Sequence, residues 1–264
     1  MCSVVQRDDT AMNLSENTEL GSAPESRARD LRNRADSHPP DAVEALPELL
    51  ALVLERDDEA REEAIEALDR LGRRTPESLI SWVDDLAELA VSPKDDVAFA
   101  GLRALAQIAG HDPTAVEPVV EQVTRAVDDD HPPCRAAALA VLAELADDAP
   151  SLVYDEIDHV LDACTHDDAT VRSAAVMAAG KAVMADPSGA DQLLDALQGA
   201  LDDPDLSVRR HAHWAYIGVA IDHPDAVDDP AGVIERLAAV TDSELDLEEG
   251  TIGDAIAGLA AQLA

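Results

Sequence analysis

Six prolines stand in strict register along this chain, each 37 residues after the one before. The sequence around them repeats too, so that the stretch ending at Pro187 reappears in the stretch ending at Pro224. A period of roughly 20 to 50 residues is typical of tandem arrays, in which each unit buries its apolar face against the next. We therefore expect one continuous array. The repeated prolines are Pro39, Pro76, Pro113, Pro150, Pro187 and Pro224.

Each unit carries the pattern of two helices. Proline suits the first helical position, where a backbone N–H has no partner to lose, and apolar residues follow at intervals of three and four. The second helix has one column of small residues and one mostly of leucine, which lets helices of neighbouring units cross closely. Since no strand-like alternation occurs, the pattern predicts an all-α fold, a right-handed α-solenoid of about six antiparallel helix pairs. The columns are Ala64, Gly101, Ala138, Ala175 and Ala212, and Leu68, Leu105, Leu142, Ala179 and Tyr216.

Two regions are predicted: a solenoid over residues 39–264, with units that begin at 39, 76, 113, 150, 187 and 224, and a tail over residues 1–38. We expect the tail to be largely disordered, because its first part shows no helical or strand period. Four arginines between Arg27 and Arg34 form the one basic segment of the protein. They lie either on a short helix against the acidic first unit or on a solvated arm.

The last unit has a longer turn than the others. Six extra residues in that turn place Ala255 in the small column and Leu259 in the leucine column. This final helix is apolar for the end of an array, so it is a candidate face for self-association.

Two segments, DATVR ending at Arg172 and DLSVR ending at Arg209, follow acidic turns and precede runs of small residues. Together with the paired helices, they resemble HEAT repeats, most closely the short subtype of the phycobilisome-lyase-like proteins. The resemblance covers residues 39–264 and implies a fold, not an activity. Arg61 and Arg135 share the column of these arginines. An arginine in the first turn of a helix faces the positive end of the dipole, so we expect all four to pair structurally with aspartates.

The charge balance is extreme, with 56 acidic against 19 basic residues and a net charge of −37. The acidic residues are spread over every unit. This favours a proteome adapted to molar salt, such as that of a haloarchaeon, over an acidic mimic that binds basic partners, since such self-repulsion needs strong screening. The same charge argues against nucleic acid as a partner. No apolar run is long enough to span a bilayer. Cys134 and Cys164 fall in apolar positions, which predicts buried free thiols and a cytoplasmic protein.

No constellation for catalysis or for a cofactor stands out. His211 and His213 are about 200° apart around a helix, so they cannot chelate one ion from one face. No histidine is followed by glutamate, as a hydroxylase of similar architecture would require. Glycine-rich nucleotide loops and nucleophile motifs are missing as well. We therefore expect a protein that is not an enzyme and that binds no metal or cofactor.

A protein partner would bind on the concave side of such a solenoid, which the second helices line. The outward positions of these helices hold apolar and cationic residues of the kinds that are enriched at binding surfaces. We predict a groove centred on Trp214, unless that side chain instead packs against the last unit. The function expected is a protein-interaction scaffold; the alternatives are a maturation factor for a cofactor- or metal-dependent enzyme and an adaptor in signalling or motility machinery. The candidate partner-binding residues are Phe99, Arg103, Met177, Lys181, Met184, Arg210, Trp214 and Ile221.

Overall fold

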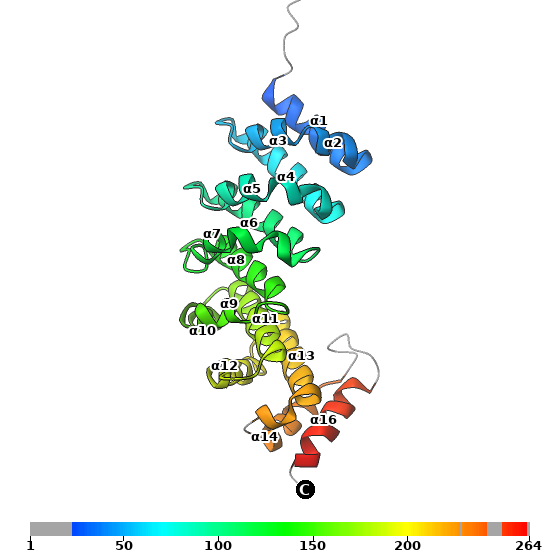
Figure 1. Ribbon diagram of the computed structural model, residues 1–264, viewed down its shortest axis with the longest axis vertical. Helices are drawn as coiled ribbons and strands as arrows, with labels where there is room; N and C mark the ends of the chain where they lie inside the picture. The colour runs from blue at the N-terminus through cyan, green and yellow to red at the C-terminus, as the bar shows by residue number, and fades with distance from the viewer. Residues whose placement is uncertain (1–22, 228, 242–249, 263–264) are drawn as a thin grey trace, which may run out of the picture.

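The computed structural model describes residues 23–227, 229–241 and 250–262, and all regular structure in this part of the chain is helical. The helices stack in chain order into one elongated column, from α1 at one end to α16 at the other (Figure 1). The predicted all-α solenoid is therefore confirmed. Residues 1–22, which hold most of the tail predicted to be disordered, lie outside the described residues.

Each unit ends with one long helix, and these helices form one layer of the solenoid. Consecutive members of this second-helix layer pack on one another along the whole column (Figure 1). The layer comprises α4 (Asp58–Arg74), α6 (Asp95–Ala109), α8 (Pro132–Leu145), α11 (Ala169–Ala185), α13 (Leu206–Asp222) and α16 (Thr251–Gln262).

The first half of each unit forms the other layer, and there the structure corrects the sequence prediction of a single helix. In the first four units the helix is broken at one register, at Ala45, Trp82, Val119 and Glu156, where φ is −95° to −113° and ψ is 10° to 20°. Proline stands close to the first and third breaks, where it removes a backbone donor. The elements are α2 (Pro39–Glu44) with α3 (Leu46–Val53), η1 (Pro76–Trp82) with α5 (Val83–Ala90), η2 (Pro113–Ala115) and η3 (Glu117–Val119) with α7 (Val120–Thr124), α9 (Ser151–Asp155) with α10 (Ile157–Cys164), α12 (Asp191–Ala200), and η4 (Pro224–Ala226) with α14 (Pro230–Leu237).

The two predicted columns of the second helices are buried in the core between the layers. Gly101 shows why the small column cannot hold larger residues: a Cβ there would lie 2.6 Å from the backbone nitrogen of Ala90 and from the carbonyl oxygen of Leu86. Tyr216, the largest member of the other column, satisfies its hydroxyl by donating to the carbonyl of Leu194 at 2.8 Å. The two columns recognised in the sequence therefore lie in the core of the structure.

Upstream of Pro39, helix α1 (Pro24–Ser37) packs along α4. It buries Leu31 together with two alanines, and it holds α4 by ion pairs from Arg29 to Glu59 at 2.8 Å and from Arg32 to Glu63 at 2.5 Å. The arginine-rich segment is thus a helix on the first unit rather than a solvated arm. The packed core extends to this helix.

At the other end, α16 closes the described array by packing on α13 and α14. Ala255 and Leu259 are fully buried, at the positions that the longer turn predicts. None of the helices in the described ranges is both long enough and apolar enough to cross a membrane.

Candidate functional site

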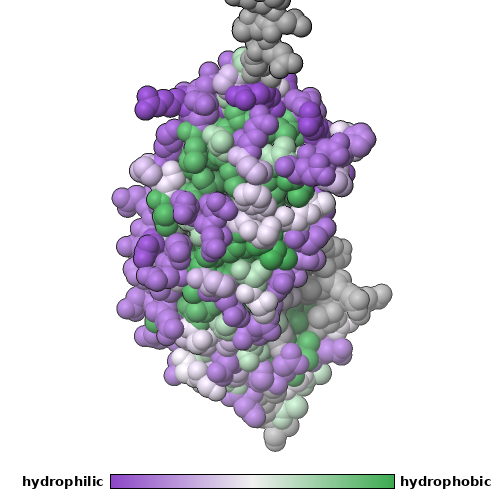
Figure 2. All heavy atoms as spheres, turned by 45° about the horizontal axis from the view of Figure 1, so that its top comes forward, coloured by the Kyte–Doolittle hydropathy of each residue, from purple (hydrophilic) through white to green (hydrophobic). Residues whose placement is uncertain are grey.

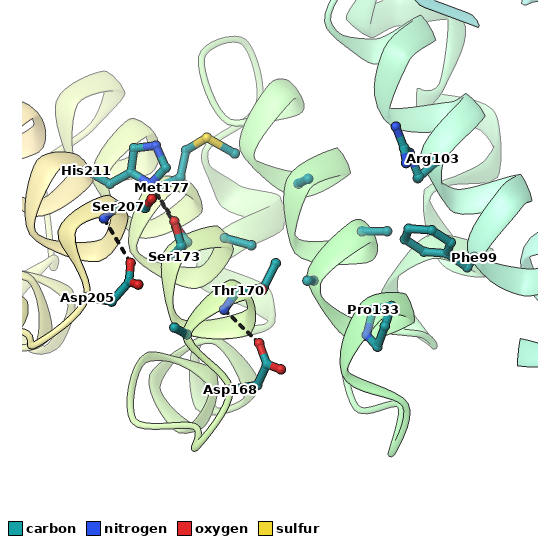
Figure 3. A pocket seen from close by; sticks show the side chains of 15 residues that line it. Phe99, Arg103, Pro133, Asp168, Thr170, Ser173, Met177, Asp205, Ser207 and His211 are labelled. Atoms are coloured by element: carbon teal, nitrogen blue, oxygen red, sulfur yellow. Dashed lines mark hydrogen bonds between the residues drawn. The ribbon is translucent and has the colours of Figure 1, made fainter. Parts of the chain in front are cut away.

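A hollow of about 500 Å³ opens on the surface of the second-helix layer, where it crosses α6, α8, α11 and α13 (Figure 3). Its floor is α8, which presents Ala136, Ala137 and Ala140 to the opening. Alanine at these outward positions leaves room that larger side chains on the neighbouring helices do not fill. We refer to this feature as the α8 hollow.

Aromatic and cationic groups line the α6 side of the hollow. The Arg103 guanidinium lies over the Phe99 ring, 5.5 Å from its centroid, in a cation–π contact. Arg103 also pairs with Asp69 of α4 at 2.5 Å, so its charge is already partnered within the protein. Met177 of α11 lies across the alanine floor from Phe99 (Figure 3). The hollow therefore has one aromatic wall and one thioether wall.

Two carboxylates lie at one edge of the hollow, at the start of α11 and of α13. Asp168 Oδ1 accepts the backbone N–H of Thr170 at 2.7 Å, and Asp205 Oδ1 accepts that of Ser207 at 2.9 Å, so both are helix N-caps. The Thr170 N–H bond holds the pKa of Asp168 below its usual value. No salt bridge among the described residues involves either carboxylate, but the Arg172 guanidinium, which is held on Asp203, interacts electrostatically with both.

A serine and a histidine also meet in the hollow. His211 Nδ1 lies 3.0 Å from Ser173 Oγ and 3.2 Å from the Ser173 carbonyl oxygen. Burial lowers the pKa of His211, which keeps the ring neutral at pH 7. A carbonyl oxygen only accepts hydrogen bonds, so this contact places the proton on Nδ1, and that nitrogen then cannot remove a proton from the Ser173 hydroxyl. The geometry therefore gives no support to a nucleophilic serine.

Of the eight predicted partner-binding residues, Phe99, Arg103 and Met177 line the α8 hollow. Lys181 instead turns toward α8, where it donates to Glu144 and Asp147 at 3.1 Å each. The structure thus brings only part of the predicted set together.

The other predicted residues lie farther along the column. Met184 fills the space above Gly218 of α13. Trp214 and Arg210 are half-buried on α13, Trp214 is packed against the core, and Ile221 is exposed near the end of that helix. The prediction of a groove centred on Trp214 therefore does not describe this hollow, which is centred on α8. The reason is that the hollow follows from missing side-chain volume on α8 and not from an exposed aromatic ring.

Several residues of the hollow were not among the predicted partner-binding set. Their signal in the sequence is weak, because an alanine on a helix is as compatible with a buried position as with an exposed one. The capping aspartates belong to the repeat motif, which by itself predicts structure and not a binding site. The added residues are Pro133, Ala136, Ala137, Ala140, Asp168, Ala169, Thr170, Ser173, Ala174, Asp205, Ser207 and His211.

The repeat arginines connect neighbouring units. Arg61 donates to Asp96 of the next unit at 2.5 Å, and Arg172 donates to both carboxylate oxygens of Asp203 at 2.9 and 3.0 Å. Burial opposes ionisation of Asp203, but the hydrogen bonds from Arg172 outweigh it and hold its pKa below the usual value. Such bidentate pairs fix orientation as well as distance.

The remaining two arginines of the column differ, since only Arg135 donates to a carboxylate and Arg209 donates to a backbone carbonyl instead. Arg135, which is nearly buried, donates to Asp162 of the following unit at 2.8 Å. Arg209 donates to the carbonyl of Asp203 in its own turn at 2.5 Å. All four therefore bind chain groups at the junctions between helices.

In the described part of the chain, no three metal-ligating side chains come together. Cys134 and Cys164 are buried free thiols, and burial raises the pKa of Cys134 to about 11 and that of Cys164 to about 12. Thiols in this state are poor nucleophiles and poor metal ligands at neutral pH.

Two further hollows continue from the α8 hollow toward α4. One of about 250 Å³ shares Phe99 and Arg103 with it, and one of about 570 Å³ shares Arg103, Ala137 and Ala140. On the face in Figure 2, apolar side chains gather along the middle and hydrophilic ones along both margins. Such an arrangement suits a partner that lies across several helices.

Comparison with known proteins places the fold. No family model matches the chain, and no curated protein matches it. Among solved structures, an engineered protein is 22% identical with a TM-score of 0.70, over 92% of this chain and 66% of that one. A designed armadillo repeat protein in complex with the peptide (KR)4 is 17% identical with a TM-score of 0.61, over 81% of this chain and 99% of its own.

Identities this low establish the fold alone. The chain is a helical repeat solenoid with the fold of engineered repeat proteins, designed armadillo repeat proteins among them.

Proposed function

We propose that this protein is a non-catalytic scaffold that binds a segment of another protein on the concave face formed by its second helices. The α8 hollow is the observation that carries the proposal, because it combines an alanine floor, an aromatic and a thioether wall, and polar groups at one edge. Concave surfaces of repeat proteins commonly serve as preformed binding sites. A preformed site loses little ordering entropy when a partner binds.

The designed armadillo protein in complex with a peptide supports this proposal, because it is a solenoid of similar fold that binds a peptide. We also propose that the acidic surface reflects adaptation to molar salt in a cytoplasm, and that the units belong to the short HEAT subtype. The spread of the 56 acidic residues over all units supports the first of these, and the DxxVR segments support the second.

Site-specific photo-crosslinking tests the scaffold function. A photoreactive amino acid replaces Ala140 on the floor of the hollow or, as the control, Val91, which is 47% exposed at the end of α5 in the first-helix layer. At native salt, the Ala140 probe should capture a defined protein and the Val91 probe should not. Equal capture at both positions, or no capture at Ala140, contradicts the proposal.

A further inference from the structure

We infer that the α8 hollow takes an extended basic segment of its partner, with an apolar side chain on the alanine floor and arginine or lysine side chains at Asp168 and Asp205. This inference rests on the proposed function and names the chemistry of the partner. It follows from three features: the charge balance of the surface, the pairing of its cations, and the geometry of the capping carboxylates.

The total charge decides which occupants are favoured. At −37, a second copy of this chain or an acidic segment is repelled at long range, and a basic segment is attracted. Long-range attraction falls off within about 3 Å at 1 M salt. In concentrated salt, therefore, only cations in direct contact with carboxylates are still attracted. The charges next to the hollow thus determine which partner binds.

The cations beside the hollow are already paired with carboxylates of the protein itself. Arg103 pairs with Asp69, and Lys181 pairs with Glu144 and Asp147. Carboxylates of a partner would have to compete with these internal pairs. At Asp168 and Asp205 a basic partner displaces no internal salt bridge, because Arg172, which attracts both carboxylates, is itself held on Asp203.

The two capping carboxylates are placed to accept further hydrogen bonds. Each binds its own helix through Oδ1, and a carboxylate has about four acceptor sites in all. A guanidinium or ammonium group can therefore bind without disturbing the cap. Ser207, beside Asp205, also lines the hollow and offers a hydroxyl group to the same segment, whereas the side chain of Thr170 already binds Asp168.

Dimensions favour an extended segment. Neighbouring packed helices lie about 8–10 Å apart, so the path from α6 to α13 is about 24–30 Å. An extended chain covers this path with about eight residues. Adjacent side chains of an extended chain point to opposite faces. A peptide in which two arginines alternate with two leucines therefore places both arginine and leucine side chains on the face toward the hollow.

A fluorescently labelled peptide of about eight residues with this alternation is the probe, and matched peptides carry glutamine or glutamate instead of arginine. Fluorescence anisotropy measures Kd at about 0.2 M and about 2 M KCl. The arginine peptide should bind more tightly than the glutamine peptide, and the glutamate peptide most weakly. The Kd values of the three peptides should lie closer together at the higher salt.

Variants of the capping residues locate the contact. Asp168→Asn and Asp205→Asn keep a good N-cap but remove the charge, and each should weaken binding of the arginine peptide about threefold. Asp57→Asn is the matched control, because Asp57 caps α4 in the same way and does not line the hollow. Its Kd should equal that of the wild type. Circular dichroism checks that all three variants are folded.

Ala140→Trp fills the floor and separates the two proposals. If the arginine and glutamine peptides bind equally and both are lost in Ala140→Trp, the hollow is a peptide site and the basic-partner inference is overturned. The arginine peptide could instead still bind Ala140→Trp, or lose as much affinity in Asp57→Asn as in Asp168→Asn and Asp205→Asn. Either result would show non-specific attraction to the acidic surface and would also overturn the basic-partner inference. Failure of every peptide to bind also overturns it, while crosslinking at Ala140 still tests the scaffold function.

Discussion

At the scale of single residues, the solenoid depends on positions where side-chain volume is nearly absent. The small column lets second helices approach closely, and the alanines of α8 open the hollow on the opposite side of the same helix. The first effect was predicted from sequence, because a column that repeats every 37 residues is visible in the chain. The hollow was not, because it depends on which face of α8 the neighbouring helices leave uncovered.

Gly101 offers a direct test of this packing. In Gly101→Ala the new methyl group would lie 2.6 Å from backbone atoms of Ala90 and Leu86, which cannot move without shifting α5. We expect a loss of about 1–3 kcal/mol in the free energy of unfolding, measured by urea denaturation. Gly199→Ala is the control, since that Cβ meets no atom within 4 Å and alanine should stabilise helix α12 by about 0.5–1 kcal/mol. Equal effects of the two substitutions would contradict the packing.

His213 should make stability depend on pH. It is 2% exposed, and its burial lowers its pKa from the ordinary 6.5 despite a hydrogen bond to the Arg209 carbonyl. Below pH 6.5 the unfolded chain therefore binds a proton that the folded chain does not, so stability is full above this pH and decreases as the pH falls. His213→Gln should show a smaller decrease between pH 7 and 5 in urea denaturation, and His38→Gln, at an exposed histidine, should match the wild type. An unchanged slope in His213→Gln would refute this origin.

At the scale of elements, the second helices were predicted well and the first helices less well. Second helices carry a strict small-residue column, so their register is set by a packing requirement that the sequence displays. The breaks at Ala45, Trp82, Val119 and Glu156 have no common residue type, and only two of them have a proline nearby. Local sequence could not predict these breaks, because they occur at the same position of each unit but not at the same type of residue.

Helix α1 is expected to act as the N-terminal cap of the array. Leu31 is 3% exposed between α1 and the first unit, so Leu31→Ala should destabilise the protein by about 2–3 kcal/mol through lost burial and a cavity. Leu54→Ala, at a leucine that is 57% exposed, should change stability by less than about 0.5 kcal/mol. Urea denaturation followed by circular dichroism compares the two. Similar small effects would indicate that α1 adds little to the core.

At the scale of the whole molecule, charge and shape act together. A solenoid gains its stability from contacts between neighbouring units, and neighbouring units here are all acidic. Arginines such as Arg61 and Arg172 bridge some junctions with aspartates. With 19 basic residues against 56 acidic ones, however, most carboxylates have no cation to pair with. The remaining repulsion must be screened by salt.

Stability should therefore fall as salt is removed. At about 0.1 M salt the screening length is about 10 Å, similar to the spacing of neighbouring helices, whereas at 1 M it is about 3 Å. We expect the helical circular dichroism signal and the urea midpoint to decrease as KCl is lowered from about 2 M to about 0.05 M. Sucrose is the control: it favours compact states by exclusion from the protein surface but does not screen charge, so it should restore stability less than KCl of equal osmolality. A midpoint that is unchanged over this range would show that self-repulsion does not limit this fold.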